Sequence, residues 1–218
     1  GEIPSYWDTI RLKFIARNLN QQILPEDSSR YIALENLQSW SGKVIEVNTE
    51  DNSLDSESGS KCFEPGDVLF NKLRPYLAKF YFAQEYGTCV GELLVLRPYQ
   101  DKLLGEYLFW NIASKAFINV VDGSTYGAKM PRASIDFIGN MMYQVPPLPE
   151  QRAIAAHLDR QTQALDELIA DKRRLIALYQ EERAALINQA VTRGLDPDAP
   201  MKDSGIEWLG EIPVHWEV

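Results

Sequence analysis

The sequence lacks the features that would assign it at once to a membrane or secreted class. It has no run of about 18 apolar residues, so no membrane span is expected. Its N-terminus does not show the basic, apolar and small-residue order of a signal peptide. The two cysteines, Cys62 and Cys89, do not have CxxC spacing. We therefore expect two reduced thiols in a cytosolic protein, with a disulfide as the less favoured alternative.

Signatures of catalysis and of metal binding are also missing. The two histidines, His157 and His215, have no Cys or Asp cluster nearby at metal-ligand spacing. There is no GxGxxG, no P-loop, no Asn/Asp-Pro-Pro-aromatic motif of amino-methyltransferases and no Glu-x-Lys of nucleases. We therefore expect a chain that performs no chemistry and holds no metal or cofactor of its own.

An excess of basic residues is absent as well. The net charge is −9, which argues against an obvious nucleic-acid binder. Residues 1–146 carry 14 basic and 18 acidic side chains, and residues 147–218 carry 8 and 13. Any DNA contact must therefore come from a local basic face. The acidic remainder could serve solubility or dock basic partner subunits.

The chain does contain a repeat of its own opening. Gly1–Trp7 reads GEIPSYW and Gly210–Trp216 reads GEIPVHW, with five identities in seven positions. We interpret the sequence as one period of a duplicated domain pair, followed by the first residues of the next copy. The alternative is a surface-docking segment that is used twice.

Residues 1–146 have the pattern of a mixed α/β domain. A helix is expected over 105–121, a glycine-rich turn over 122–127, a final strand region over 135–145 and a polar loop over 48–60. Short β-branched or aromatic runs, bounded by turn residues, predict these strands: Tyr31–Leu34, Lys43–Val47, Val68–Phe70, Ala78–Ala83 and Glu92–Leu96.

A long helix is predicted next, over the segment 147–194. Prolines at positions 146, 147 and 149 end the first domain and suit a helix start, and no Pro or Gly follows between residues 150 and 193. Apolar residues form a heptad ladder at Ile154, Leu158, Leu165, Leu168, Leu175, Tyr179 and Leu186. This spacing is typical of a coiled-coil seam. A single core cannot bury so long a helix, so we expect a partner helix, with residues 195–218 forming a linker and the start of a second repeat.

Two stretches are candidate binding surfaces. Within Pro65–Lys79, a phosphate clamp with a stacking ring is predicted at Asn71, Lys72, Arg74, Tyr76 and Lys79. Within Ser124–Arg132, a loop that enters a DNA groove is predicted at Ser124, Thr125, Tyr126, Lys129 and Arg132. The alternatives are a solvated hairpin for the first and an ordinary connecting loop for the second.

Several motifs together resemble a known family, the specificity (S) subunits of type I DNA restriction-modification systems. The resemblance covers the whole length and rests on these segments: FEPGDVLF at 63–70, LRP at 73–75, GAKMPR at 127–132, PLPEQR at 147–152, RGLDP at 193–197 and DSGIEWLGEIP at 203–213. The PLPEQR helix start and the 203–213 junction are specific in combination.

The resemblance implies a division of labour. In such proteins two target recognition domains each read one half of a split DNA site, and two long helices pair antiparallel and set the spacing. Methyltransferase subunits, which bind S-adenosylmethionine, flip out the target adenine. Restriction subunits, which use ATP and Mg²⁺, join to cleave unmodified DNA. The S subunit has no chemistry of its own.

The chain departs from this pattern because it has one recognition domain and one spacer helix, so we expect a half-subunit that is natural or engineered. Two copies would pair through the helices with C2 symmetry. Arg suits guanine and Asn suits adenine, but the residues do not assign bases to side chains. The alternative function is a scaffold whose helix docks protein partners without DNA contact. An enzyme is a third class, which would need a catalytic cluster.

Overall fold

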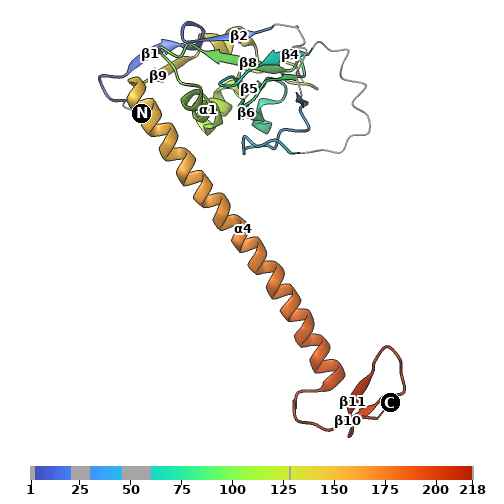
Figure 1. Ribbon diagram of the computed structural model, residues 1–218. Coiled ribbons are helices and arrows are strands. Elements are labelled where there is room, and N and C mark those ends of the chain that lie inside the picture. Colours follow the sequence, from blue (N-terminus) through green and yellow to red (C-terminus); the bar gives the residue numbers. More distant parts are fainter. Residues whose placement is uncertain (1–2, 21–29, 46–59, 128, 218) are drawn as a thin grey trace. The chain divides into compact units, whose positions relative to one another are not determined.

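The computed structural model describes residues 3–20, 30–45, 60–127 and 129–217 (Figure 1). The expected loop over 48–60 and the end of the expected strand Lys43–Val47 lie largely outside these residues. The chain divides into two compact units, Gly1–Asp159 and Arg160–Val218. Helix α4 (Leu148–Arg193) contributes residues to both.

The first unit is built on a four-stranded antiparallel sheet. Its strand order is β2-β8-β5-β6, with β2 at Ala16–Leu19, β8 at Leu93–Pro98, β5 at Val68–Asn71 and β6 at Phe80–Phe82. Every residue of β5 is buried. Because alternate residues of a strand face opposite sides, both faces of this sheet must be covered.

Two smaller strand groups accompany it. Strand β7 (Gly87–Cys89) pairs in parallel with β3 (Tyr31–Ile32) and antiparallel with β4 (Lys61–Phe63). Strand β1 (Asp8–Arg11) pairs antiparallel with β9 (Met142–Val145), which runs directly into α4. The N-terminal segment is therefore tied to the chain just before the long helix.

Several short helices of the first unit pack beside the main sheet or against one another. They are α1 (Gly105–Ala113), α2 (Lys115–Gly123), α3 (Ile135–Asn140) and the 3-10 helices η1 (Leu12–Phe14) and η3 (Pro75–Leu77). Val68 and Phe70 of β5 belong to the core cluster that contains the helix residues. Leu69 belongs to a second cluster with β3, β4 and β7. The predicted mixed α/β class is confirmed.

Some expected elements differ in the structure. The single helix expected over 105–121 is two helices, because Ser114 is extended and its hydroxyl accepts a hydrogen bond from the N–H of Phe117 (3.2 Å), which caps α2. The strand region expected over 135–145 is wrong in its first half. Residues 135–140 form α3, whose Ile138 is buried in the larger core, and only 142–145 form a strand. Helical packing of Ile138 outweighs the local β propensity there.

The predicted long helix is present and its 46 residues correspond to about 69 Å at the usual rise. It ends before Gly194, whose φ of 79° suits a left-handed stop. No helix among the described residues is long and apolar enough to cross a membrane.

The second unit ends in a short hairpin, β10 (Met201–Asp203) with β11 (Glu211–Pro213). The two repeat copies share a local turn. The N–H of Trp7 donates to the carbonyl of Pro4 at 3.0 Å, and the N–H of Trp216 donates to that of Pro213 at 2.9 Å. The Pro-to-Trp part of the repeat therefore has the same turn in both copies.

Candidate nucleic-acid interface

The two predicted binding loops, which are about fifty residues apart in sequence, are joined by backbone hydrogen bonds. The N–H of Arg74 donates to the carbonyl of Pro131 at 2.8 Å, and the N–H of Ala133 donates to that of Lys72 at 2.9 Å. Leu73 and Arg132 form an isolated β-bridge between the same segments. We call this combined surface the joined loops.

The first loop is shaped by Asn71, which is buried. Its amide nitrogen donates to the carbonyl of Leu73 at 2.7 Å, and its amide oxygen accepts from the N–H of Leu73 at 2.9 Å. Both ends of the Asn71 side chain are thus bonded within the loop. This arrangement fixes the backbone that leads to Arg74.

The turn at η3 is strained. Arg74 before it and Ala78 after it have φ values of 52° and 45°, in the left-handed region that non-glycine residues avoid. Arg74 is exposed, and Tyr76 between them is 48% exposed. Strained backbone often accompanies functional surfaces, and here it presents one cation and one aromatic ring to solvent.

The second loop is capped at its base by two hydroxyls. Ser124 Oγ donates to the carbonyl of Val121 at 2.7 Å, and Thr125 Oγ1 donates to that of Asp122 at 2.8 Å, so both groups serve the C-terminal end of α2. Tyr126 and Arg132 exchange two backbone hydrogen bonds. The tip between them carries Lys129, and the side chains of Tyr126 and Lys129 are exposed.

The predicted cations do not all have the same freedom. Arg132 pairs with Glu92 at 2.9 Å, Lys72 lies 3.7 Å from the same carboxylate, and Lys79 Nζ donates to the carbonyl of Leu34 at 2.6 Å. Burial opposes ionisation of Glu92, but the hydrogen bond from Arg132 and the nearby charges outweigh it and lower the Glu92 pKa. Glu92 therefore stays ionised and holds two of the cations.

Sequence analysis missed three polar residues beside the joined loops. Asn18, Asn20 and Lys61 line a pocket of about 210 Å³ together with Lys72, Tyr126 and Arg132. Lys61 is buried, and its Nζ donates to the carbonyl of Leu93 at 2.8 Å. Burial and the neighbouring charge of Lys72 lower the Lys61 pKa. No local pattern marks these residues, because strand pairing alone brings them to the pocket.

The Pro65-Gly66-Asp67 segment is a structural turn that leads into β5. Asp67 is buried, its Oδ2 accepts from the N–H of Glu64 at 2.9 Å, and its carboxylate accepts two hydrogen bonds from Arg97 at 2.7 and 2.8 Å. Glu64 reaches the same guanidinium at 2.7 Å from a more exposed position. This ion-paired turn anchors the N-terminal side of the candidate interface.

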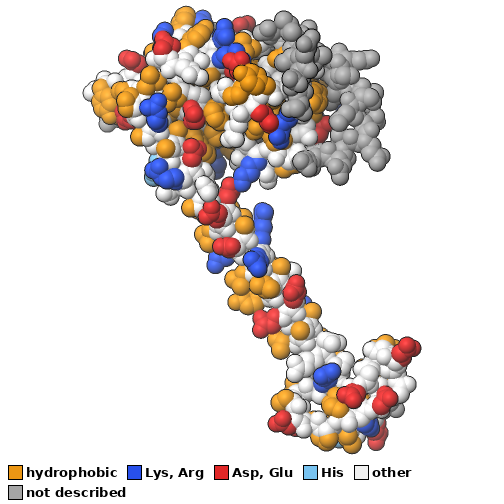
Figure 2. All heavy atoms as spheres, viewed as in Figure 1, with side chains coloured by type: hydrophobic (Ala, Val, Ile, Leu, Met, Phe, Trp, Pro, Cys, Tyr) orange, Lys and Arg blue, Asp and Glu red, His pale blue; other side chains and the backbone are white. Residues whose placement is uncertain are grey.

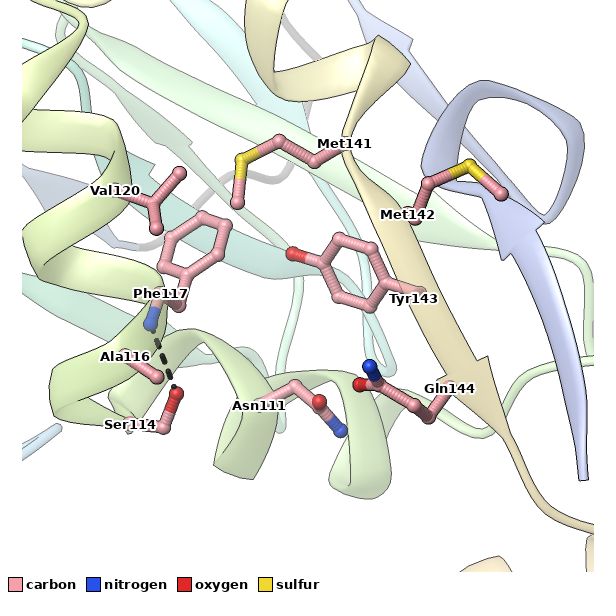
Figure 3. Close-up of a pocket in the computed structure, with 9 residues that line it drawn as sticks. All are labelled: Asn111, Ser114, Ala116, Phe117, Val120, Met141, Met142, Tyr143 and Gln144. Atoms are coloured by element: carbon pink, nitrogen blue, oxygen red, sulfur yellow. Dashed lines mark hydrogen bonds between the residues drawn. The ribbon is translucent and has the colours of Figure 1, made fainter. Parts of the chain in front are cut away.

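A second pocket, of about 240 Å³, has a different character. Figure 3 shows its apolar wall of Phe117, Val120, Met141 and Met142, and none of the predicted DNA-binding residues line it. Ser114 at its rim is already the cap of α2. Burial raises the pKa of Tyr143, which keeps its phenol neutral. The pocket thus offers no evident nucleophile that is paired with a general base.

Burial disfavours the thiolate form of both cysteines by raising their pKa. Cys62 and Cys89 are both thiols and not disulfide-bonded, and burial raises the pKa of Cys89 to about 12, which disfavours a nucleophilic thiolate. Among the described residues no group of three His, Cys, Asp or Glu side chains could hold a metal ion.

The predicted helix ladder has two environments. Ile154 packs against the larger core of the first unit, and Leu158 is half-buried. Figure 2 shows hydrophobic side chains at the surface of the helix beyond that point. Five ladder residues are between 39% and 60% exposed: Leu165, Leu168, Leu175, Tyr179 and Leu186.

Comparison with known proteins agrees with the predicted resemblance. No protein-family model matches the chain. It is 25% identical over 162 residues to the type I restriction enzyme EcoDI specificity subunit of Escherichia coli, which covers 72% of this chain and 35% of the relative. It is 29% identical over 130 residues to the MjaVIII specificity subunit of Methanocaldococcus jannaschii, which covers 59% of this chain and 28% of the relative.

The fold has a solved counterpart. The HsdS subunit from Thermoanaerobacter tengcongensis superposes with a TM-score of 0.66 at 23% identity, over 94% of this chain and 53% of that chain. The curated relatives and this structure confirm the resemblance to type I specificity subunits. In each of these matches the chain spans little more than half of the other protein's length, or less.

Proposed function

We propose that this chain, a relative of type I restriction enzyme specificity subunits, is a non-catalytic DNA recognition module that directs adenine methylation, and restriction, by partner subunits. The observation that carries the proposal is the joining of the two loops. Each loop carries cations beside an aromatic ring or a turn, and the two backbones are hydrogen-bonded to each other. One combined surface is a better candidate for a duplex than two separate loops.

The side chains divide into contact and support roles in this proposal. Arg74, Tyr76, Tyr126 and Lys129 are exposed and would meet phosphates and bases first. Lys72 and Arg132 would exchange Glu92 for DNA phosphate oxygens. The remaining predicted residues would hold the loops in shape through the hydrogen bonds described above: Asn71, Lys79, Ser124 and Thr125.

The domain roles follow the same scheme. Residues 1–146 would form the target recognition domain, 147–194 the spacer helix, and 195–218 the start of a second repeat. Methyltransferase subunits would supply S-adenosylmethionine chemistry, and restriction subunits would supply ATP- and Mg²⁺-dependent cleavage in a cytosolic complex. The chain itself would need no cofactor.

Helix α4 is proposed to pair with α4 of a second copy. Its exposed ladder, Leu165 to Leu186, continues the heptad spacing over about three heptads. Ile169 and Ile176 stand next to ladder positions and are 48% and 57% exposed, which widens the apolar stripe. A C2 pair would present two recognition domains to a symmetric, interrupted DNA site.

The direct test is to combine the full chain with its cognate methyltransferase subunit and to sequence the methylated sites. Methylation at one split adenine motif is expected. The Arg74→Ala/Lys129→Ala double variant should bind DNA more weakly and reduce the slope of log affinity against log salt by about 2. The matched control removes two exposed cations elsewhere, Lys102→Ala/Lys115→Ala, and should leave the slope nearly unchanged.

The scaffold function remains as a second candidate because the chain carries a net charge of −9. A scaffold would bind the methyltransferase subunit through α4 without contacting DNA. Equal salt slopes for the Arg74/Lys129 variant and its control, with the complex intact, would favour the scaffold over DNA recognition.

A further inference from the structure

The polar pocket beside the joined loops, which we call the Asn18 pocket, has no assigned role. Its polar lining consists of Asn18, Asn20, Lys61, Lys72, Tyr126, Arg132 and Ser134. Asn18 lies on β2, where it is opposite Leu96 of β8, and Asn20 follows the end of that strand. The pocket thus draws on the main sheet as well as on the joined loops.

Asn18, which also lines a neighbouring pocket with Lys13 and Asn140, carries an unsatisfied side-chain atom. Its Oδ1 atom is buried and has no hydrogen-bond partner in the part of the chain that the structure describes. A buried amide oxygen without a donor carries a free-energy penalty, so native proteins rarely keep one without a reason.

The charge of the pocket indicates what kind of partner is missing. Lys61, Lys72 and Arg132 all line it, and Glu92 is the carboxylate that Lys72 and Arg132 contact. This is a local excess of positive charge on an acidic chain. Tyr126, which is 64% exposed, adds a ring face at the pocket wall. A ligand with a hydrogen-bonding edge, a flat face and a neighbouring negative charge fits these three features together.

We infer that the Asn18 pocket receives the edge of a DNA base, with Asn18 and Asn20 as specificity-determining residues and the cations on the adjoining phosphate. Adenine is the favoured base, because the exposed amide of Asn20 can pair with both its N6 and its N7. The surrounding Lys72 and Arg132 would position the backbone without reading sequence. This inference rests on the proposed DNA-recognition function and assigns base reading to residues outside both predicted loops.

The test uses the full chain in complex with its methyltransferase subunit and a duplex library of randomised sequence. Asn18→Ala and Asn20→Ala are compared with Asn119→Ala, which removes an exposed amide on α2 away from the pocket. Each pocket variant should relax the preference at a single base position by about 5- to 150-fold. Asn119→Ala should retain the wild-type motif. Because Asn20 is exposed, its substitution also tests the pocket if Asn18→Ala fails to fold.

Three results would overturn the inference. An unchanged motif in a folded Asn20→Ala variant and in Asn18→Ala would show that the pocket does not read a base. Uniformly weaker binding with no change in motif would assign the pocket to phosphate alone. In both cases the wild-type motif would still support DNA recognition, whereas a wild-type complex without any motif would remove the proposed function and this inference together.

Discussion

The first unit and the part of α4 beyond Asp159 contain similar apolar residues, but the first unit buries them and the helix exposes them. In the first unit the large aliphatic and aromatic residues of the sheet are buried, as Val68, Phe70 and Leu96 illustrate. Along α4, Leu165, Leu168 and Tyr179 are more than half exposed. The first unit can satisfy its own hydrophobic surface, whereas the helix needs another surface to cover it. Folding and association should therefore respond to different substitutions.

The largest effect is expected from the helix ladder. Leu168→Asp/Leu175→Asp should raise the dimer dissociation constant more than 1000-fold, because four leucines lose burial in a symmetric pair and each contributes about 1.5–3 kcal/mol. Sedimentation at micromolar concentration measures the change. The control, Ala170→Asp/Ala177→Asp, places the same charges on the opposite face of the helix. Equal behaviour of the two variants, or a wild-type monomer, would contradict the paired helix.

The next effect concerns the first unit alone. Asp67→Ala should lower its free energy of unfolding by about 3–5 kcal/mol, because Arg97 would lose a buried, doubly hydrogen-bonded partner. Glu64→Ala removes the more exposed partner of the same guanidinium and should change the free energy of unfolding by less than about 1 kcal/mol. Denaturant unfolding gives both values. The dimer dissociation constant should be the same for the two variants. A change in this constant that is confined to Asp67→Ala would contradict the independence of folding and association.

A smaller effect is expected at the joined loops. Glu92→Gln should release Lys72 and Arg132, strengthen binding to non-specific duplex DNA about tenfold and increase the salt slope by up to about 2. Fluorescence titration at several salt concentrations measures both quantities. Glu106→Gln, an exposed substitution on α1, supplies the same change in net charge. If it has an equal effect, the gain comes from overall charge and not from release of the two cations.

The smallest effect is a pH dependence of the first unit. The thiol of Cys89 has a pKa of about 12 when folded and a usual value of 9.0, so the folded state retains this proton after the unfolded chain has lost it. Its contribution to stability is complete below pH 9 and decreases as the pH rises toward 12, by about 1 kcal/mol at pH 10. Lys61, whose pKa is lowered, acts in the opposite direction.

Comparison with Cys89→Ala isolates the thiol. The difference in unfolding free energy between wild type and this variant should change between pH 9 and 11 and stay constant between pH 6 and 8. A constant difference over the whole range would place the Cys89 thiol in a less buried environment than the one described. Association of α4 should show no matching dependence, because neither cysteine lies on the helix.

The sequence predicted best those features that depend on local periodicity. The helix from Leu148 to Arg193 follows from the absence of Pro and Gly and from the heptad ladder. The short strands β4 and β7 were missed because each has only three residues and derives its stability from pairing. The break at Ser114 depends on a single capping hydroxyl inside an otherwise helical pattern.

The candidate site was predictable only in pieces. Cations and turn residues pointed to each loop separately, but the hydrogen bond between Arg74 and Pro131 is a tertiary contact with no sequence signal. The pairing of Lys72 and Arg132 with Glu92 was likewise hidden, since Glu92 was expected only as the start of a strand. Asn18 and Lys61 lie more than forty residues apart and meet only through the sheets.

The left-handed backbone of Arg74 separates a requirement of folding from a requirement of function. A left-handed arginine costs about 1–2 kcal/mol relative to a residue without a Cβ, and the chain does place glycine at comparable positions such as Gly66 and Gly127. Arg74→Gly would therefore ease the backbone. Arg74 thus keeps an exposed cation at a position where glycine would relieve the backbone, and this cost is balanced only if its side chain serves a contact.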